Sequence, residues 1–166
     1  MENLFGLPAH PLLVHVPVVL VPLAAIGAVA MAVRQAWMRS FGWVVTALAG
    51  VGFLGTLLAA SSGEELEERR EASGQTISKV LQDHGEMGEA AEVWVALFFA
   101  LVLAWVVFSW WRRRAGDEKV AAKVRKPKAI SIALMVLALA SSAAATVSIT
   151  ATGHNGAKAV WDNDAP

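Results

Sequence analysis

The sequence predicts an all-α protein, a bundle of four transmembrane helices that run up-down-up-down with both termini outside the cell (N-out, C-out). Three observations support this fold class. Of the 166 residues, 56% are hydrophobic, whereas roughly 45–50% is usual for a soluble domain. The hydrophobic residues gather into four long blocks, and the basic residues gather in the connections on one side of them. We therefore expect one membrane domain over residues 1–166.

Four apolar blocks are long enough to cross a bilayer. Each is close to the roughly 20 residues that a hydrocarbon layer ~30 Å thick requires, and they cover residues 12–33, 41–60, 91–111 and 129–152. Glu92, at the edge of the third block, is the only Asp, Glu, Lys or Arg within them. The first block is expected to be a retained helix rather than a signal peptide, because no basic residue precedes it.

The charges of the connections predict the orientation. Arg34 and Arg39 follow the first block, and Lys and Arg are abundant in the loop over residues 112–128. By the positive-inside rule, both connections are cytoplasmic. The loop over residues 61–90 opens instead with four glutamates within residues 64–68, and we expect it outside together with both termini.

Composition excludes several classes of function. The formal net charge is zero and there is no cysteine. The charge balance gives no reason to expect a nucleic-acid partner. The absence of cysteine excludes disulfides, thiolate metal sites, iron–sulfur clusters and covalently attached haem, so histidines and carboxylates remain as strong ligands. The sequence shows no Ser-His-Asp arrangement with plausible spacing, and we do not expect an enzyme.

All four histidines fall on the predicted outer side. His10 and His15 enter the first span, His84 precedes the third, and His154 follows the fourth. Three helices therefore bring them to one face of the bundle. Because histidines are also common and solvated at membrane interfaces, this position alone does not define a site.

Two prolines bracket the entry to the first span. Pro11 fits the first turn of a helix, where its missing N–H costs nothing. Pro17 cannot bond to the carbonyl of Leu13, which predicts a bend beside His15 where a prosthetic group could lie. The alternative interpretation is a proline-kinked helix end with His10 as a capping residue.

His84 is predicted to face the bundle. It belongs to an apolar set with helical spacing, formed by Ile77, Val80, Leu81, His84, Gly88 and Ala91. Gly88, one turn later, leaves space for a flat macrocycle or, as is more frequent in membranes, for a closely packed helix. Gly153 and Gly156 flank His154 and predict that the chain leaves the helix there.

Small residues predict close helix packing in the second and fourth spans. In the second span they form a GxGxxG pattern inside an apolar block, which indicates packing and not nucleotide binding. The residues concerned are Gly50, Gly52 and Gly55, and in the fourth span Ser141, Ala145, Ser148 and Thr152.

Three motifs stand out: LPAHPLLVHVP at residues 7–17, His84-Gly85 followed by Gly88, and TGHNG at residues 152–156. Together they resemble a prokaryotic four-helix membrane family, domain of unknown function 2231, over nearly the whole chain. The resemblance implies the cell membrane of a prokaryote. Because some members are joined to Rieske-type or cytochrome c domains, it also implies respiratory electron transfer with a b-type haem. Here Ala157 and Lys158 stand where the family usually has a second glycine.

From the histidines and this resemblance we expect an electron carrier of a respiratory chain that binds one or two b-type haems through axial imidazoles. The candidate ligands are His10, His15, His84 and His154, with Gly88 beside them. A narrower expectation is one haem held by His15 with His84 or His154, because His10 and His15 lie about 140° apart on a helix. Partners would be the lipid bilayer and other membrane or periplasmic electron-transfer proteins.

Two alternatives remain open. The same four histidines could bind Zn or Cu, since both metals accept neutral imidazole. The chain could instead be an accessory subunit of a larger membrane complex, with small-residue faces that dock partner helices and histidines that are incidental.

Overall fold

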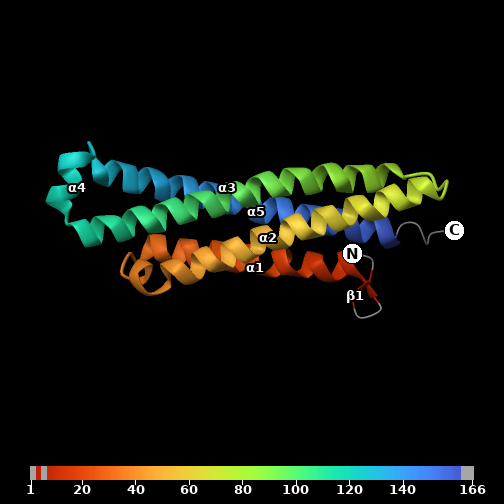
Figure 1. Ribbon diagram of the computed structural model, residues 1–166, viewed down its shortest axis with the longest axis horizontal. Coiled ribbons are helices and arrows are strands. Elements are labelled where there is room, and N and C mark those ends of the chain that lie inside the picture. The colour runs from red at the N-terminus through yellow and green to blue at the C-terminus, as the bar shows by residue number, and fades with distance from the viewer. Residues whose placement is uncertain (1–2, 5–6, 162–166) are drawn as a thin grey trace.

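The computed structural model describes residues 3–4 and 7–161, and in this part of the chain it is helical apart from one short strand pair. The helices are α1 (Ala9–Val33), α2 (Trp37–Ala72), α3 (Lys79–Ala115), α4 (Asp117–Lys123) and α5 (Pro127–Trp161). Before α1, β1 (Asn3–Leu4) pairs antiparallel with β2 (Leu7–Pro8). The four long helices lie side by side, with α4 at one end of the bundle and β1 towards the other (Figure 1).

The prediction of four membrane spans is confirmed. Four helical segments are long and apolar enough to cross a bilayer, namely His10–Val33, Trp37–Ala72, Lys79–Ala115 and Pro127–Lys158. The long helices contact one another in the cyclic order α1, α2, α3, α5. Many large apolar side chains point outwards, such as Ile26 and Val147 with 66% and 67% exposure. In a soluble protein such a surface would be unfavourable, whereas in a bilayer it contacts lipid.

The connection over residues 61–90, expected as an acidic outer loop with helical spacing around His84, is largely helical in the structure. Only residues 73–78 lie outside α2 and α3, which contain 36 and 37 residues. At 1.5 Å per residue each helix is about 54 Å long, well beyond the ~30 Å of a hydrocarbon layer. The two helices therefore continue past their apolar segments as a polar helical hairpin.

Local interactions explain why this polar hairpin is helical. Glu65 and Arg69 form an ion pair at 2.7 Å, and Lys79 and Asp83 form another at 3.0 Å; both have the i, i+4 spacing that supports exposed helices. The hydroxyl of Ser78 accepts a hydrogen bond from the N–H of Leu81 and so caps the start of α3. The helical spacing around His84 predicts a helix for the second half of this connection, and α3 confirms it. The acidic residues at the end of α2 carry no such apolar period, so nothing in the sequence indicated that α2 continues as far as Ala72.

At the opposite end of the bundle, the loop predicted over residues 112–128 is also partly helical. It contains the last turn of α3, the short helix α4 and the start of α5. Gly116, between α3 and α4, has φ of 81°, a backbone conformation that glycine adopts readily because it has no Cβ. The chain can therefore turn sharply between the two helices.

Small residues bring α1 and α2 into close contact, as predicted. A Cβ added at Gly55 would lie 2.6 Å from Cγ1 of Val16, and one at Gly52 would lie 3.0 Å from Cγ2 of Val21. Gly50 faces Phe99 of α3, 3.1 Å from its ring by the same measure. The predicted packing role of these glycines is therefore confirmed.

Among the long helices, α3 and α5 make the most extensive contact. Ser141 and Ala145 of the predicted small-residue face of α5 are buried. The chain was expected to leave the helix near Gly153, but α5 continues to Trp161. This expectation was wrong because contacts with α3 hold the last turns of α5 in place, as described below.

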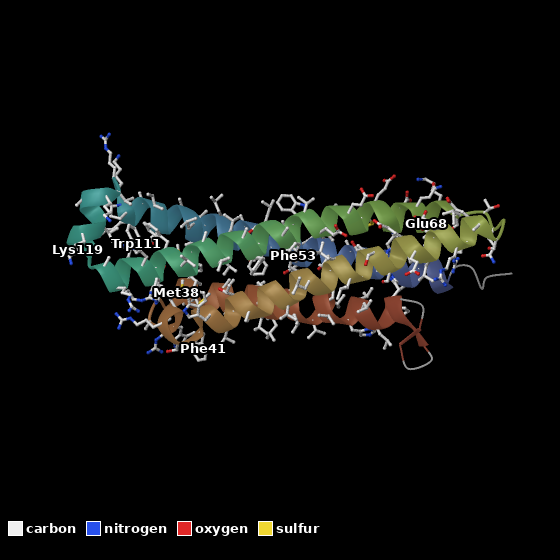
Figure 2. All side chains as sticks on the ribbon, in the orientation of Figure 1. Met38, Phe41, Phe53, Glu68, Trp111 and Lys119 are labelled. Carbon is white, nitrogen blue, oxygen red and sulfur yellow. The ribbon has the colours of Figure 1, made fainter. Side chains whose placement is uncertain are left out.

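The two ends of the bundle differ in charge. The histidine end comprises the start of α1, the α2–α3 hairpin and the last turns of α5. The arginine end comprises the α1–α2 connection, the last turns of α3, α4 and the start of α5. Figure 2 shows Glu68 at the histidine end, and Met38, Trp111 and Lys119 towards the arginine end.

Candidate histidine site

Two histidines from different helices meet at the histidine end. His10 lies in the first turn of α1, and His84 lies in the second turn of α3. Their ring centroids are 6.2 Å apart and their planes are perpendicular, at 90°. Both side chains are half-buried. The fold therefore brings together two imidazoles that are 74 positions apart in the chain.

Backbone carbonyls determine which nitrogen of each ring carries hydrogen. Nδ1 of His10 lies 2.9 Å from the carbonyl oxygen of Ala59, and Nδ1 of His84 lies 3.1 Å from that of Thr152. A carbonyl oxygen only accepts hydrogen bonds, so Nδ1 is the donor in both rings. In the neutral imidazole, Nε2 then keeps its lone pair. Histidines that bind metals use this arrangement, in which a carbonyl orients the ring and leaves the second nitrogen available.

Each ring rests on the backbone of a neighbouring helix at a glycine. A Cβ added at Gly63 of α2 would lie 3.1 Å from Cε1 of His10, and one at Gly156 of α5 would lie 2.7 Å from Cε1 of His84. Gly156 is therefore a position at which even a methyl group would collide with the imidazole. The rings are held between helices, and all four long helices contribute to the site.

The residues of α2 in this site were missed in the sequence. Ser62 is buried, and its hydroxyl donates to the carbonyl of Ala59 at 2.7 Å and lies 3.1 Å from Nδ1 of His10. A signal for them was present, because Ala59, Ser62 and Gly63 continue the helical spacing of Gly52 and Gly55. The acidic residues that follow directly were read as the start of a polar loop, so the continuation of the small-residue face was not recognised.

Polar groups also hold α5 to α3 beside His84. The hydroxyl of Thr152 lies 3.1 Å from the carbonyl oxygen of Met87 and 2.9 Å from that of Ser148. The side-chain amide of Asn155 lies 3.2 Å from the sulfur of Met87. These contacts account for the continuation of α5 through two glycines, which by themselves weaken a helix.

The other two histidines point away from this pair. His15 is exposed, and its Nδ1 donates to the carbonyl of Pro11 in the same helix at 2.6 Å. Five residues correspond to about 140° of rotation, so His15 faces outwards when His10 faces the bundle. His154 is exposed as well. The structure therefore brings His84 together with His10, and not with His15 or His154 as the narrower expectation had it.

Gly88 and the acidic residues near His84 add no further ligand to the His10–His84 site. No described atom lies within 4 Å of a Cβ built at Gly88, so there is open space beside it. Asp83 is paired with Lys79, and Glu86 and Glu89 are exposed. Within residues 3–4 and 7–161, no three His, Cys, Asp or Glu side chains come together as a possible metal site. The described site therefore offers two imidazole ligands.

Comparison with known proteins places the chain in a family. No curated protein and no solved structure matches it. A family model described as "Predicted membrane protein (DUF2231)" matches residues 6–165, which is nearly the entire chain. The match agrees with the four membrane-spanning helices of the structure. The chain therefore belongs to the family of predicted membrane proteins that contain domain of unknown function 2231.

Proposed function

We propose that this protein is a membrane electron carrier that binds one b-type haem through His10 and His84. The observation that carries the proposal is the pair of neighbouring imidazoles from α1 and α3, each with Nδ1 bound to a backbone carbonyl and Nε2 left for a ligand bond. A haem with two histidine ligands, when bound, takes up and releases one electron without an open coordination position. The chain would contribute the ligands, their orientation and the surrounding apolar bundle.

The spacing of the rings suits a shared metal ion. Imidazole nitrogen binds metals at about 2.0–2.1 Å, so two imidazoles must lie close together to share one ion. The ring centroids of His10 and His84 are 6.2 Å apart. His10 and His84 would therefore be the residues that hold the haem iron. The open space beside Gly88 lies one turn from His84 on the same helix.

The number of ligands favours haem over zinc. Structural zinc sites take four protein ligands and catalytic zinc sites take three, whereas haem needs only two axial histidines. The described residues offer His10 and His84 together and no group of three. For this reason we prefer haem to the zinc alternative.

We further propose that the histidine end faces outwards across the cell membrane of a prokaryote, with both termini on that side. The support is the distribution of charge: Arg39, Arg112 and Arg113 lie at one end, and Glu64 and Glu68 lie at the other. Basic loops stay in the cytoplasm during insertion. The electron-transfer partners would then be membrane or periplasmic proteins that reach the outer surface.

Absorption spectroscopy tests the haem proposal. The protein would be expressed with ample haem, purified in mild detergent and measured before and after addition of dithionite. We expect a Soret band and a reduced α-band of the b type. His10→Ala and His84→Ala should each abolish or strongly alter these bands, whereas His15→Ala and His154→Ala, at exposed positions, should retain them.

Two results would contradict the proposal. A colourless protein that contains stoichiometric zinc or copper would replace haem with a metal ion. A full spectrum in both His10→Ala and His84→Ala, combined with its loss in His15→Ala, would move the ligands to the exposed histidines. Far-UV circular dichroism of every variant shows whether a lost band reflects a lost ligand or a lost fold.

A further inference from the structure

The arginine end contains a cavity that plays no part in the histidine site. Its volume is about 950 Å³, and it is open on one side, because Arg39 and Arg113 in its lining are exposed. The α1–α2 connection and the start of α2 form one side, the last turns of α3 form another, and Ser131 of α5 completes it. Trp105 of α3, which is 1% exposed, lies at the buried side. In Figure 2, Met38 marks this region of the bundle.

Three arginines from two helices line this cavity. Arg39 comes from α2, and Arg112 and Arg113 come from α3. Arg39 and Arg113 line the same cavity from different helices, so their positive charges lie close together. An anion placed between two like charges lowers their free energy, so the cavity is suited to a negatively charged ligand.

The donor groups fit a phosphoryl group in particular. The planar guanidinium of arginine presents two parallel N–H groups that match two oxygens of a phosphate. The hydroxyls of Ser109 and Ser131 and the amide of Gln35 add uncharged donors in the same cavity. The volume exceeds that of a lone phosphate, which leaves room for the group to which the phosphate is attached.

The position of the cavity points to a lipid. Trp37 and Trp110 are exposed at the same end of the bundle, and exposed tryptophans concentrate at the headgroup layer. Basic pockets between transmembrane helices are suited to anionic headgroups. From these observations we infer that the arginine end binds a phosphoryl group, supplied by the headgroup of an anionic phospholipid in the adjoining leaflet. This inference is independent of the haem proposal, because it uses other residues at the opposite end.

Lipid binding to the purified, delipidated protein tests the inference. Phosphatidylglycerol, or phosphatidylcholine as the zwitterionic comparison, is titrated into the detergent solution. The midpoint of thermal unfolding is then recorded, since a ligand that binds the folded state raises it. Native mass spectrometry counts the lipids retained. We expect phosphatidylglycerol to stabilise the wild type more than phosphatidylcholine does, with one lipid retained per chain.

Matched arginine variants locate the site. Combined Arg39→Gln and Arg113→Gln should weaken the apparent affinity for phosphatidylglycerol at least about tenfold, because both charge-assisted bonds are lost. Arg114→Gln is the control: its guanidinium lies over the ring of Trp110 at 5.4 Å, and Arg114 does not line the cavity. Its affinity should stay within about twofold of the wild type, since only the diffuse charge changes.

A conservative double variant keeps the test valid if the double glutamine variant does not fold. Combined Arg39→Lys and Arg113→Lys retains the charge but removes the planar fork, so affinity should fall about three- to tenfold with unchanged helical content. Inorganic phosphate forms a separate arm. Stabilisation by phosphate alone, lost in the same variants, would keep the phosphoryl site and identify a soluble ligand as its source.

Two outcomes would overturn the inference. In the first, phosphatidylglycerol and inorganic phosphate bind the wild type and the arginine variants equally. In the second, Arg114→Gln weakens binding as much as the double variant does, which would show a general effect of positive charge and not a built site.

Discussion

The contact of His84 with α5 can be measured by adding one methyl group at Gly156. An ideal Cβ there would lie 2.7 Å from Cε1 of His84 and 3.2 Å from its Nδ1, whereas nonbonded atoms prefer about 3.5–4.0 Å. In Gly156→Ala the ring must move by about 1 Å, which disrupts the 3.1 Å bond from Nδ1 to the carbonyl of Thr152. That bond contributes about 0.5–1.5 kcal/mol, and overpacking typically costs about 1–3 kcal/mol in total.

Gly153→Ala is the matched control for this substitution. Gly153 lies on the same helix, one turn earlier, and a Cβ there would meet no described atom within 4 Å. Replacement of glycine by alanine inside a helix stabilises it by about 0.8–1.0 kcal/mol, and this gain applies at both positions. The difference between the two variants therefore isolates the collision with His84, and we expect Gly156→Ala to be less stable than Gly153→Ala by about 1–3 kcal/mol.

A double-mutant cycle shows whether His84 is the group that collides. In the His84→Ala background the ring is gone, so Gly156→Ala should behave like Gly153→Ala. The coupling energy between positions 84 and 156 should then equal the cost of the collision, about 1–3 kcal/mol. Reversible unfolding in mixed micelles, followed by circular dichroism, measures these values. Two results would refute the described contact of His84 with α5. One is equal stability of Gly156→Ala and Gly153→Ala, and the other is a loss of stability in Gly156→Ala that persists when His84 is replaced by alanine.

Three further predictions concern packing, hydrogen bonding and orientation. Gly55→Ala places a Cβ 2.6 Å from Cγ1 of Val16 and should lower the stability by about 1–3 kcal/mol, whereas Gly88→Ala has open space and should not; equal unfolding midpoints would argue against the α1–α2 contact. Thr152→Val removes the hydroxyl bond to the carbonyl of Met87 in α3 and should cost about 0.5–1.5 kcal/mol. Thr150→Val is its control, because the Thr150 hydroxyl bonds to carbonyls of its own helix, and an equal loss in both would assign the effect to α5 alone. The chain has no cysteine, so single cysteines can report topology: Gln75→Cys should react with a membrane-impermeant maleimide on intact cells, and Arg125→Cys only after permeabilisation. The reverse labelling pattern would invert the proposed orientation.

The sequence was informative where a single physical constraint acts on a long stretch of chain. A segment in hydrocarbon must satisfy its own backbone hydrogen bonds, so about 20 consecutive apolar residues predict a helix regardless of the neighbouring segments. For this reason the four spans could be predicted, and so could the packing role of Gly52 and Gly55. Both predictions depend on the local composition of one helix.

The sequence was less informative outside the hydrocarbon layer. There, water satisfies the backbone hydrogen bonds as well as a helix does, and most polar stretches, such as the acidic end of α2, carry no apolar period that would predict a helix. The helical hairpin over residues 61–90 depends on the Ser78 cap and on ion pairs such as Glu65 with Arg69. The last turns of α5 depend on contacts of Thr152 and Gly156 with α3. The hairpin thus depends on interactions within each helix, whereas the last turns of α5 form because tertiary contacts add to weak local preferences.

The histidine pair shows what the sequence could predict about this site and what only the tertiary structure decided. The sequence by itself determined that four histidines lie near one end of a four-helix membrane bundle, because alternation of the spans leaves no other arrangement. Which of them meet depends on the rotation of each helix about its own axis, and that rotation is set by packing between helices. The fit of α1 on Gly52 and Gly55 of α2 turns His10 inwards and His15 outwards, and the contact of α5 with α3 places His84 against Gly156. Only the tertiary structure decided that His10 and His84 share one site, because the fit between side chains of different helices is not encoded in any one of them.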